Sequence, residues 1–202
     1  MGDFMKLFLY GASAEGMIQY SRFSHYVQDL QPAETRGTVY RLKVGYPVLV
    51  EGGQDLVRGQ VAQLQLSDIA LELMDQLNGF HKLNQQDSLF WRKEIMITTQ
   101  DQGIQRVWAY VLNPARVPKD AMVVRDGDWL THMKEQPALP ETLTEKQRHY
   151  ILKLGRASSR EVIPIEMGMY RELLKLEIIV DKGRRLALSK LGHDVFKYLN
   201  RE

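Results

Sequence analysis

The stretch Lys6-Leu-Phe-Leu-Tyr-Gly-Ala-Ser13 consists of a short apolar run that is closed by a glycine. Its apolar run up to Tyr10 predicts a short buried strand, and Gly11 predicts a tight turn directly after it. A turn of this kind exposes the backbone N–H groups of the following residues, Ala12 and Ser13, and can hold an anion or a carboxylate. An ordinary turn without a ligand is the alternative.

Further strand signals surround one helix signal in the next part of the chain. Apolar runs predict strands at Thr38–Val44, Tyr46–Val50, Leu56–Leu64, Trp91–Thr98 and Arg106–Leu112. Glu51–Asp55, with its two glycines, predicts the loop of a hairpin. Ser67 or Asp68 can cap a helix that ends at Asn78-Gly79 and has apolar residues at helical spacing, namely Ile69, Leu71, Leu73, Met74 and Leu77. We predict an α+β fold, a small mixed β-barrel with flanking helices.

The stretch Lys134–Thr144 contains two prolines and predicts a linker. We assign residues 1–134 to the barrel, 135–143 to the linker and 144–202 to a second domain. The second domain is predicted as helix, helix, helix, hairpin and helix, an order that resembles a winged helix. These elements are a helix from Thr144 to about Leu154, a short helix from Ser158, a helix over Pro164–Glu177, a hairpin around Asp181–Gly183 and a helix from Ser189 to about Leu199.

The composition is that of an ordinary globular protein, since 44% of the 202 residues are hydrophobic and 26% are charged. The sequence contains no cysteine, which excludes disulfides, thiolate metal sites and thiol catalysis. The histidines lack metal-ligand spacing and no phosphate-binding glycine motif occurs, so we predict neither a metal nor a cofactor. Neither a membrane span nor a signal peptide is visible, and we expect a soluble, cytoplasmic protein with no membrane partner.

Short motifs in a familiar order link the first domain to a known superfamily. They are Tyr10-Gly11, Gly37–Tyr40, Gly45–Pro47, Val57–Gly59, Met74-Asp75 with Asn78-Gly79, Trp108–Tyr110 and Gly127–Trp129. With them, residues 4–134 resemble the γ-glutamylcyclotransferase-like superfamily, which includes the avirulence-induced-gene-like proteins. The resemblance implies the barrel and a small amino-acid-like ligand bound by Tyr10, Gly11, Ala12, Ser13 and Tyr110. It also implies cyclisation of γ-glutamyl amides or amines to 5-oxoproline without a cofactor.

The general base of that reaction is missing from its expected position. The substrate's own α-amine attacks its γ-carbonyl, so a base must take a proton from the amine. The resemblance places a glutamate in a pattern similar to L-D-x-x-E-G, whereas this chain has Met74-Asp-Gln-Leu-Asn-Gly79. Asn78 stands where the glutamate is expected, and an amide cannot accept and release a proton near neutral pH. We therefore predict a ligand-binding pseudoenzyme, and an active cyclotransferase with a displaced base is the first alternative.

Other titratable groups of the first domain are candidates for a displaced base. They are Glu51, Glu72, Asp75, Asp87, Glu94, His25 and His81. For the carboxylates an exposed, solvated role is the favoured interpretation, and for the histidines a packed or surface role. The polar segment His81–Leu89 follows the helix, and we expect it to cover the mouth of the cavity.

Basic residues in the second domain raise the question of nucleic-acid binding. From Glu141 onward the chain has 13 Lys and Arg against 9 Asp and Glu. The candidate contacts are Arg171 and Lys175 on the recognition helix of a winged helix, and Lys182, Arg184 and Arg185 on its wing. Glu166, Glu172 and Glu177 oppose the basic residues of the helix. We therefore favour protein contact, such as a homodimer, over the remaining alternative of a ligand-sensing DNA-binding regulator.

Overall fold

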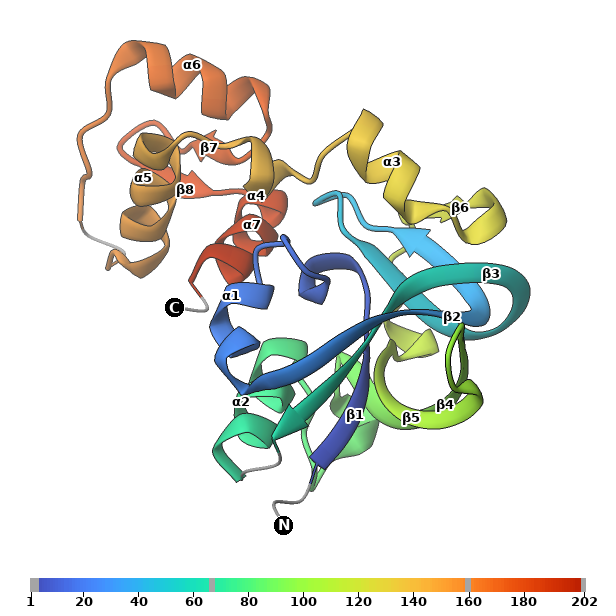
Figure 1. Ribbon diagram of the computed structural model, residues 1–202. Helices are drawn as coiled ribbons and strands as arrows, with labels where there is room; N and C mark the ends of the chain where they lie inside the picture. Colours follow the sequence, from blue (N-terminus) through green and yellow to red (C-terminus); the bar gives the residue numbers. More distant parts are fainter. Residues whose placement is uncertain (1–3, 66–67, 159–160, 201–202) are drawn as a thin grey trace. The chain divides into compact units, whose positions relative to one another are not determined.

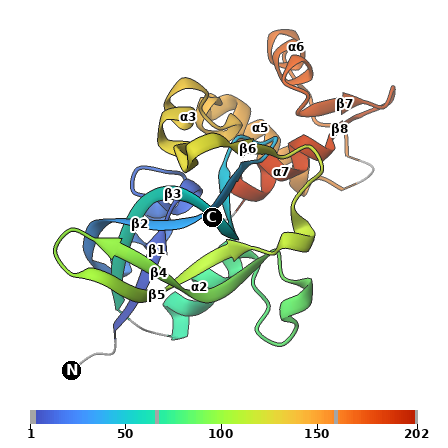
Figure 2. The same cartoon turned by 90° about the vertical axis from the view of Figure 1, so that its right-hand side faces the viewer.

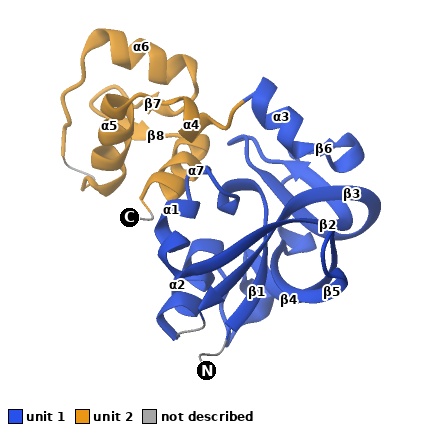
Figure 3. Cartoon of the chain, viewed as in Figure 1, with its two compact units in different colours: residues 1–136 blue, residues 137–202 orange. Residues whose placement is uncertain are grey.

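The chain divides into two compact units, Met1–Gln136 and Pro137–Glu202, which Figure 3 shows in different colours. The structure is a computed structural model and describes residues 4–65, 68–158 and 161–200. The boundary between the units falls inside the proline-containing stretch of the sequence. Within the described ranges, no helix is long and apolar enough to span a membrane.

The N-terminal unit combines strands, helices and short 3-10 turns. Its strands are β1 (Phe4–Leu9), β2 (Val27–Arg41), β3 (Pro47–Gln65), β4 (Phe90–Thr99), β5 (Gly103–Leu112) and β6 (Met122–Val124). Its helices are α1 (Tyr20–Phe23), α2 (Asp68–Asn78) and α3 (Trp129–Glu135). The 3-10 turns lie at Gly11–Ser13, Ser24–Tyr26, Gln85–Asp87, Pro114–Arg116 and Arg125–Gly127. The α+β class predicted from the sequence is confirmed.

The strands of this unit form one mixed sheet in the order β3-β1-β5-β4-β2-β6. β1 and β5 pair in parallel, and the other neighbouring strands are antiparallel. β2 also pairs with β3, so the pairing returns from β2 to the first strand of the order. Figures 1 and 2 show β2 and β3 as long, strongly curved strands, and this curvature lets the additional pairing form.

The prediction of a hairpin around Glu51–Asp55 is wrong. The two flanking segments do not pair with each other, because both belong to β3 and both pair with β2. Val50 and Asp55 pair with adjacent residues of β2, so residues 51–54 bulge out of the pairing. The two glycines of the bulge have φ of +86° and +93°. A hairpin loop and a bulge both use this left-handed backbone, so the glycines alone do not distinguish them.

α2 packs against the sheet through a face that differs slightly from the predicted one. Ala70, Met74 and Leu77 are buried at the i, i+4 and i+7 spacing of one helix face. Met74 and Leu77 belong to a core cluster that includes Met5, Leu7, Leu9, Ala62, Leu64 and Tyr110 of the sheet. Ile69 is 70% exposed, although its apolar character predicts burial. This packing fixes α2 against the sheet (Figure 1). Asn78 is the last residue of α2.

The C-terminal unit is mainly helical. It consists of α4 (Leu139–Thr142), α5 (Glu145–Arg156), α6 (Met167–Lys175), a two-stranded sheet of β7 (Ile179–Asp181) and β8 (Leu186–Leu188), and α7 (Lys190–Leu199). Thr144 caps α5 in a capping box with Gln147, and Ser189 caps α7. Buried apolar residues of this unit include Tyr150, Ile151, Leu173, Ile178, Leu188, Leu191, Val195 and Leu199.

Two helix predictions in this unit need correction. The short helix expected from Ser158 is not formed, since residues 161–166 have no regular structure, while residues 159–160 lie outside the described part. α6 begins at Met167 instead of Pro164. Glu166 is the N-cap residue of α6 and has extended backbone (φ −70°, ψ 141°), so the helix does not include Pro164. Part of the predicted linker is itself helical, as α4.

Candidate functional site

The turn after β1 is shaped by Gly11. This residue has φ of +57°, and a Cβ atom there would lie 2.8 Å from the carbonyl oxygen of Pro47. Any other residue would strain the backbone and collide with β3. The turn closes where the N–H of Ser13 donates to the carbonyl of Tyr10 at 3.2 Å. In the part of the chain that the structure describes, the N–H groups of Gly11 and Ala12 donate to no acceptor.

The polar side chains beside this turn have partners inside the fold. The hydroxyl of Tyr10 donates to the carbonyl of Tyr110 at 2.8 Å and accepts from the N–H of Leu49 at 3.1 Å. It thereby joins β1, β5 and β3. The hydroxyl of Ser13 donates to the side chain of Gln19 at 3.0 Å. The hydroxyl groups of Tyr10 and Ser13 are therefore both engaged within the fold.

Asp75 on α2 is held by two residues of the sheet. Arg92 on β4 donates from Nη1 to both carboxylate oxygens at 2.9 Å, and the hydroxyl of Tyr110 donates to Oδ1 at 2.6 Å. The side chains of Arg92 and Asp75 are only 14% and 17% exposed. The guanidinium of Arg92 also lies 5.0 Å from the centre of the Phe80 ring. Burial, followed by the hydrogen bond to Asp75, raises the pKa of Tyr110 well above its usual range, so this phenol stays a donor.

Asn78 is the last residue of α2 and is 8% exposed. Its Nδ2 donates to the carbonyl oxygen of Met74 at 2.8 Å. Gly79 follows with φ of +59°, the left-handed conformation that commonly ends a helix. The Asn78 amide therefore stabilises the end of α2, and it offers no group that takes up a proton near neutral pH.

The sequence matches a family model described as "Gamma-glutamyl cyclotransferase, AIG2-like" over residues 7–131. The chain belongs to this family. Among curated proteins, none matches the chain.

Solved structures that resemble this member of the family are distant in sequence. YkqA from Bacillus subtilis is 18% identical with a TM-score of 0.49, and the match covers 66% of this chain but only 42% of YkqA. An AIG2-like protein from Mus musculus is 12% identical with a TM-score of 0.46, over 57% of this chain and 80% of its own. A gamma-glutamyl cyclotransferase is 14% identical with a TM-score of 0.43, over 86% and 99%. Family membership therefore rests on the sequence match.

Most of the candidate replacements for the family's base are exposed to solvent. Glu72, Asp87, His25 and His81 are exposed, and the equally exposed Glu51 and Glu94 form ion pairs with Lys93 and Arg106. Asp75 is the only candidate that is largely buried, and its oxygens already accept hydrogen bonds from the sheet. Within the described residues, no His, Asp and Glu side chains cluster closely enough to hold a metal ion.

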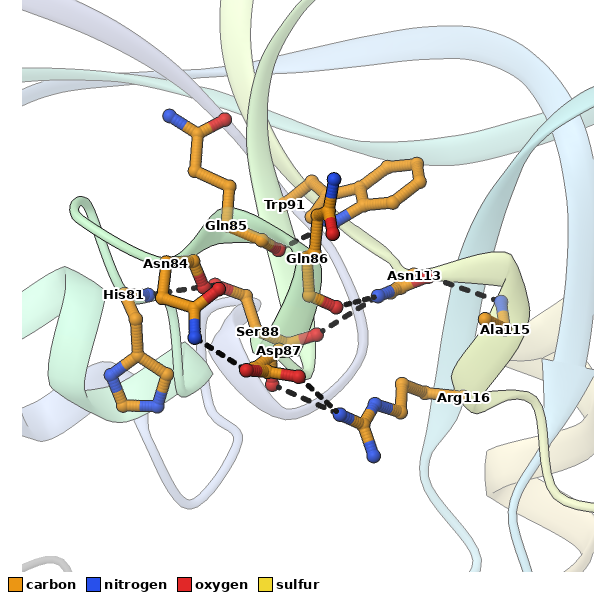
Figure 4. A network of polar contacts seen from close by, with 10 residues as sticks. All are labelled: His81, Asn84, Gln85, Gln86, Asp87, Ser88, Trp91, Asn113, Ala115 and Arg116. Carbon is orange, nitrogen blue, oxygen red and sulfur yellow. Dashed lines mark hydrogen bonds and ion pairs between the residues drawn. The ribbon is translucent and has the colours of Figure 1, made fainter.

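The polar segment after α2 is tied to Asn113 (Figure 4). Asn113 is 2% exposed, and its Nδ2 donates to the carbonyls of Gln86 and Ser88 at 3.1 and 3.2 Å. Its Oδ1 accepts a backbone N–H at 3.0 Å. The indole N–H of Trp91 donates to the carbonyl of Gln85 at 3.0 Å, which adds a contact to β4. The segment is thus fastened to the ends of β4 and β5, whereas its predicted role as a cover for the cavity stays a prediction.

Sequence reasoning missed Arg92, Lys93 and Asn113. Each of them acts through a partner that is distant in the sequence, and no local motif identifies such a pairing. The available signal is the alternation of side chains along the predicted strand of Trp91–Thr98. It places Arg92 and Lys93 on opposite faces of the sheet, where each can meet different partners.

The residues predicted as nucleic-acid contacts lie at the surface of the C-terminal unit. Arg171 and Lys175 on α6 and Lys182 and Arg184 in the β7–β8 turn are exposed, and Arg185 is partly buried. The acidic Glu172 on the same helix accepts a hydrogen bond from Gln147 at 2.8 Å. Met167 and Leu174 of α6 are also exposed, at 63% and 40%. The surface of α6 is therefore mixed in charge and partly apolar.

Proposed function

We propose that the N-terminal unit binds a small amino-acid-like ligand at the turn after β1 and does not cyclise it. Membership of the family supports a γ-glutamylcyclotransferase-like function. The observation that carries the proposal is the state of Asn78, which stands where the family resemblance implies the base. Its buried amide is bonded to the carbonyl of Met74 and cannot take a proton from an attacking amine.

The turn itself supports ligand binding. It lies at the end of β1 in a sheet that we propose to be a closed barrel, because β2 pairs with both β3 and β4. The adjacent N–H groups of Gly11 and Ala12 are without acceptors in the described part of the chain. Adjacent backbone donors in a turn favour a carboxylate or an oxyanion. This turn supplies such donors for a ligand even though the base is absent.

An assay for 5-oxoproline tests the proposal directly. We expect no release above background from γ-glutamylamines or γ-glutamyl dipeptides, while calorimetry detects binding of at least one of them. Asn78→Glu restores a base at the family's position and should gain turnover. Asn78→Gln introduces a side chain as long as that of glutamate but without a titratable group, and should gain no turnover. Robust release of 5-oxoproline by the unaltered protein would show that it is not a pseudoenzyme.

An active cyclotransferase with Asp75 as displaced base is the second candidate. Asp75 lies on the same helix, one turn before Asn78, and is largely buried. Its oxygens already accept hydrogen bonds from Arg92 and Tyr110, which argues against it as a free proton acceptor. Asp75→Asn separates the two candidates, because it abolishes any turnover that depends on Asp75 and leaves the gain produced by Asn78→Glu in place.

For the C-terminal unit we propose a winged helix that contacts protein, including a second copy of the chain, rather than DNA. The exposed Met167 and Leu174 on α6 support this, since apolar groups contribute to protein contacts and not to phosphate binding. Titration of the full chain with mixed-sequence duplex DNA should show no tight binding at moderate salt. Nanomolar binding with a steep salt dependence, lost on changing Arg184 and Arg185 to Ala, would overturn this proposal.

A further inference from the structure

One edge of β4 is unpaired over most of its length. β4 pairs with β5 from Phe90 to Thr99, but β2 meets its other edge only at Thr98 and Thr99. In the parts of the chain with described structure, no other strand pairs with that edge. The edge from Phe90 to Ile97 is therefore open, although the pairing of β2 with β3 joins the two ends of the sheet elsewhere.

Two hydrogen bonds show which backbone groups of β4 point outward at this edge. The hydroxyl of Thr35 on β2 donates to the carbonyl of Met96 at 2.8 Å, so that carbonyl points away from β5. The carbonyl of Leu89 instead accepts the backbone N–H that directly follows β5, so it points toward β5. Backbone groups alternate in direction along a paired strand. The N–H and carbonyl groups of Arg92 and Glu94 therefore point outward, where a further strand can pair with them.

The side chains along this edge are complementary to a second copy of themselves. In an antiparallel pair of two β4 strands with Lys93 at the two-fold axis, Arg92 lies opposite Glu94 of the second copy. In the same register Trp91 lies opposite Ile95, and the axis makes each contact occur twice. Opposite charges, and an aromatic residue beside a β-branched one, are favourable cross-strand pairs. The outward backbone groups of Arg92 and Glu94 bond to each other in this register.

The side chains of Arg92 and Glu94 can make this contact without loss of the fold. Arg92 holds Asp75 through Nη1, and a guanidinium has further donors on Nε and Nη2. Glu94 pairs with Arg106 at 3.9 Å, and the two side chains are 47% and 68% exposed. Such an exposed pair contributes little, so Glu94 exchanges this partner at small cost.

Lys93 at the axis limits the strength of the contact. Charged residues on an edge strand oppose pairing with a second copy, because like charges then face each other. The ammonium of Lys93 is paired with the carboxylate of Glu51 from its own chain, so each copy brings an ion pair to the axis. The repulsion is reduced and not removed. We therefore expect association with a Kd in the micromolar range.

We propose that the open edge of β4 is a self-association surface, at which a second copy of the chain adds its own β4 in antiparallel orientation. The two sheets then continue into each other across a two-fold axis. Main-chain hydrogen bonds supply the affinity, as in other cases where a strand is added to an open edge, and the side-chain pairs fix the register. This surface uses a different element from the contact proposed for α6.

Sedimentation equilibrium and hydrogen exchange test this on the full chain. At about 100 µM, well above a micromolar Kd, we expect twice the mass of one chain, and the mass of a monomer after dilution. Hydrogen exchange of the peptide covering residues 90–96 should slow severalfold from dilute to concentrated protein, because the outward amides become paired. A monomer at every concentration overturns the inference.

Proline separates the edge from the fold. Glu94→Pro removes an outward N–H that takes no part in the pairing of β4 with β5, so this variant should fold and stay monomeric. Arg106→Ala is the matched control, since it removes the partner of the Glu94 side chain and changes no backbone group. It should dimerise at least as well as the unaltered protein. Lys93→Thr removes the like charges at the axis and should tighten association about two- to fivefold.

A second variant at the same position keeps the test decisive if Glu94→Pro does not fold. Glu94→Arg retains the backbone N–H but places like charges opposite each other at Arg92, so it should weaken association severalfold. Unchanged association in Glu94→Arg, or a dimer that survives Glu94→Pro, overturns the inference. Loss of that surviving dimer in Leu174→Ser would assign the contact to α6 instead.

Discussion

Two ion pairs made by neighbouring residues of β4 differ in almost every physical respect. Arg92 turns to one face of the sheet and holds Asp75 by two hydrogen bonds, with both side chains less than one-fifth exposed. Lys93 turns to the other face and pairs with Glu51, with both side chains 41% exposed. The first pair joins α2 to the sheet, and the second joins a strand to a bulge. One strand thus carries a buried ion pair and an exposed one.

The surroundings explain the difference. Asp75 also accepts a hydrogen bond from Tyr110, and Arg92 lies against the Phe80 ring. Removing one partner of this group leaves a buried charge without compensation, which is costly. The Lys93 pair has water on its open side, so either charge is solvated when the other is removed. The buried pair therefore matters for stability, and the exposed pair contributes little to it.

The largest effect is expected from breaking the buried pair. Asp75→Ala should lower the free energy of unfolding by about 3–5 kcal/mol, because it leaves the Arg92 guanidinium buried and unpaired. Denaturant unfolding, followed by a signal from the N-terminal unit, measures this. Glu72→Ala, an exposed acidic residue on the same helix, is the control and should cost less than about 0.5 kcal/mol. Equal costs for the two variants would mean that the pair does not join α2 to the sheet.

The next largest loss of stability is expected on removing the hydroxyl of Tyr110, and this loss depends on pH. Tyr110→Phe removes a hydrogen bond to a charged group and should cost about 1.5–3 kcal/mol at neutral pH. The pKa of this phenol is raised in the folded protein, so the unfolded chain loses the proton first as pH rises. Its contribution is therefore complete below about pH 10 and is lost above that value. Unfolding of both proteins between pH 7 and pH 11 should show the difference shrinking, and a constant difference contradicts this assignment.

The two ion pairs also show that the sequence predicts local elements but not contacts between distant segments. The strand ending at Tyr10-Gly11, the helix ending at Asn78-Gly79 and the alternating strand of Trp91–Thr98 follow from local patterns, and the structure has all three. The partners of Arg92 and Lys93 do not follow, because those contacts depend on how distant segments pack. The hairpin prediction for the residues after Val50 fails for a related reason. Glycines indicate that the backbone can adopt a left-handed conformation, but they do not indicate which strands pair.

A smaller effect is expected at Asn113, which fastens the segment that also contacts Trp91. Asn113→Ala removes the donor to two carbonyls of the 81–88 segment and should cost about 1–3 kcal/mol. Hydrogen exchange of the amides in that segment should become faster, and Trp91 fluorescence should shift toward that of a solvated indole. Asn84→Ala, an exposed member of the same network, is the matched control and should change neither. Unchanged exchange in Asn113→Ala would contradict a supporting role for Asn113.

The smallest change in stability is expected from breaking the exposed pair of Lys93 and Glu51. Glu51→Gln should change the free energy of unfolding by no more than about 1 kcal/mol, since both partners are half-exposed and remain hydrated without each other. The residual effect should disappear in high salt, because screening weakens such pairs. Denaturant unfolding of Glu51→Gln and of the unaltered protein at low and high salt measures this. A cost comparable to that of Asp75→Ala, insensitive to salt, would show that the Lys93–Glu51 pair stabilises the fold as much as the buried pair does.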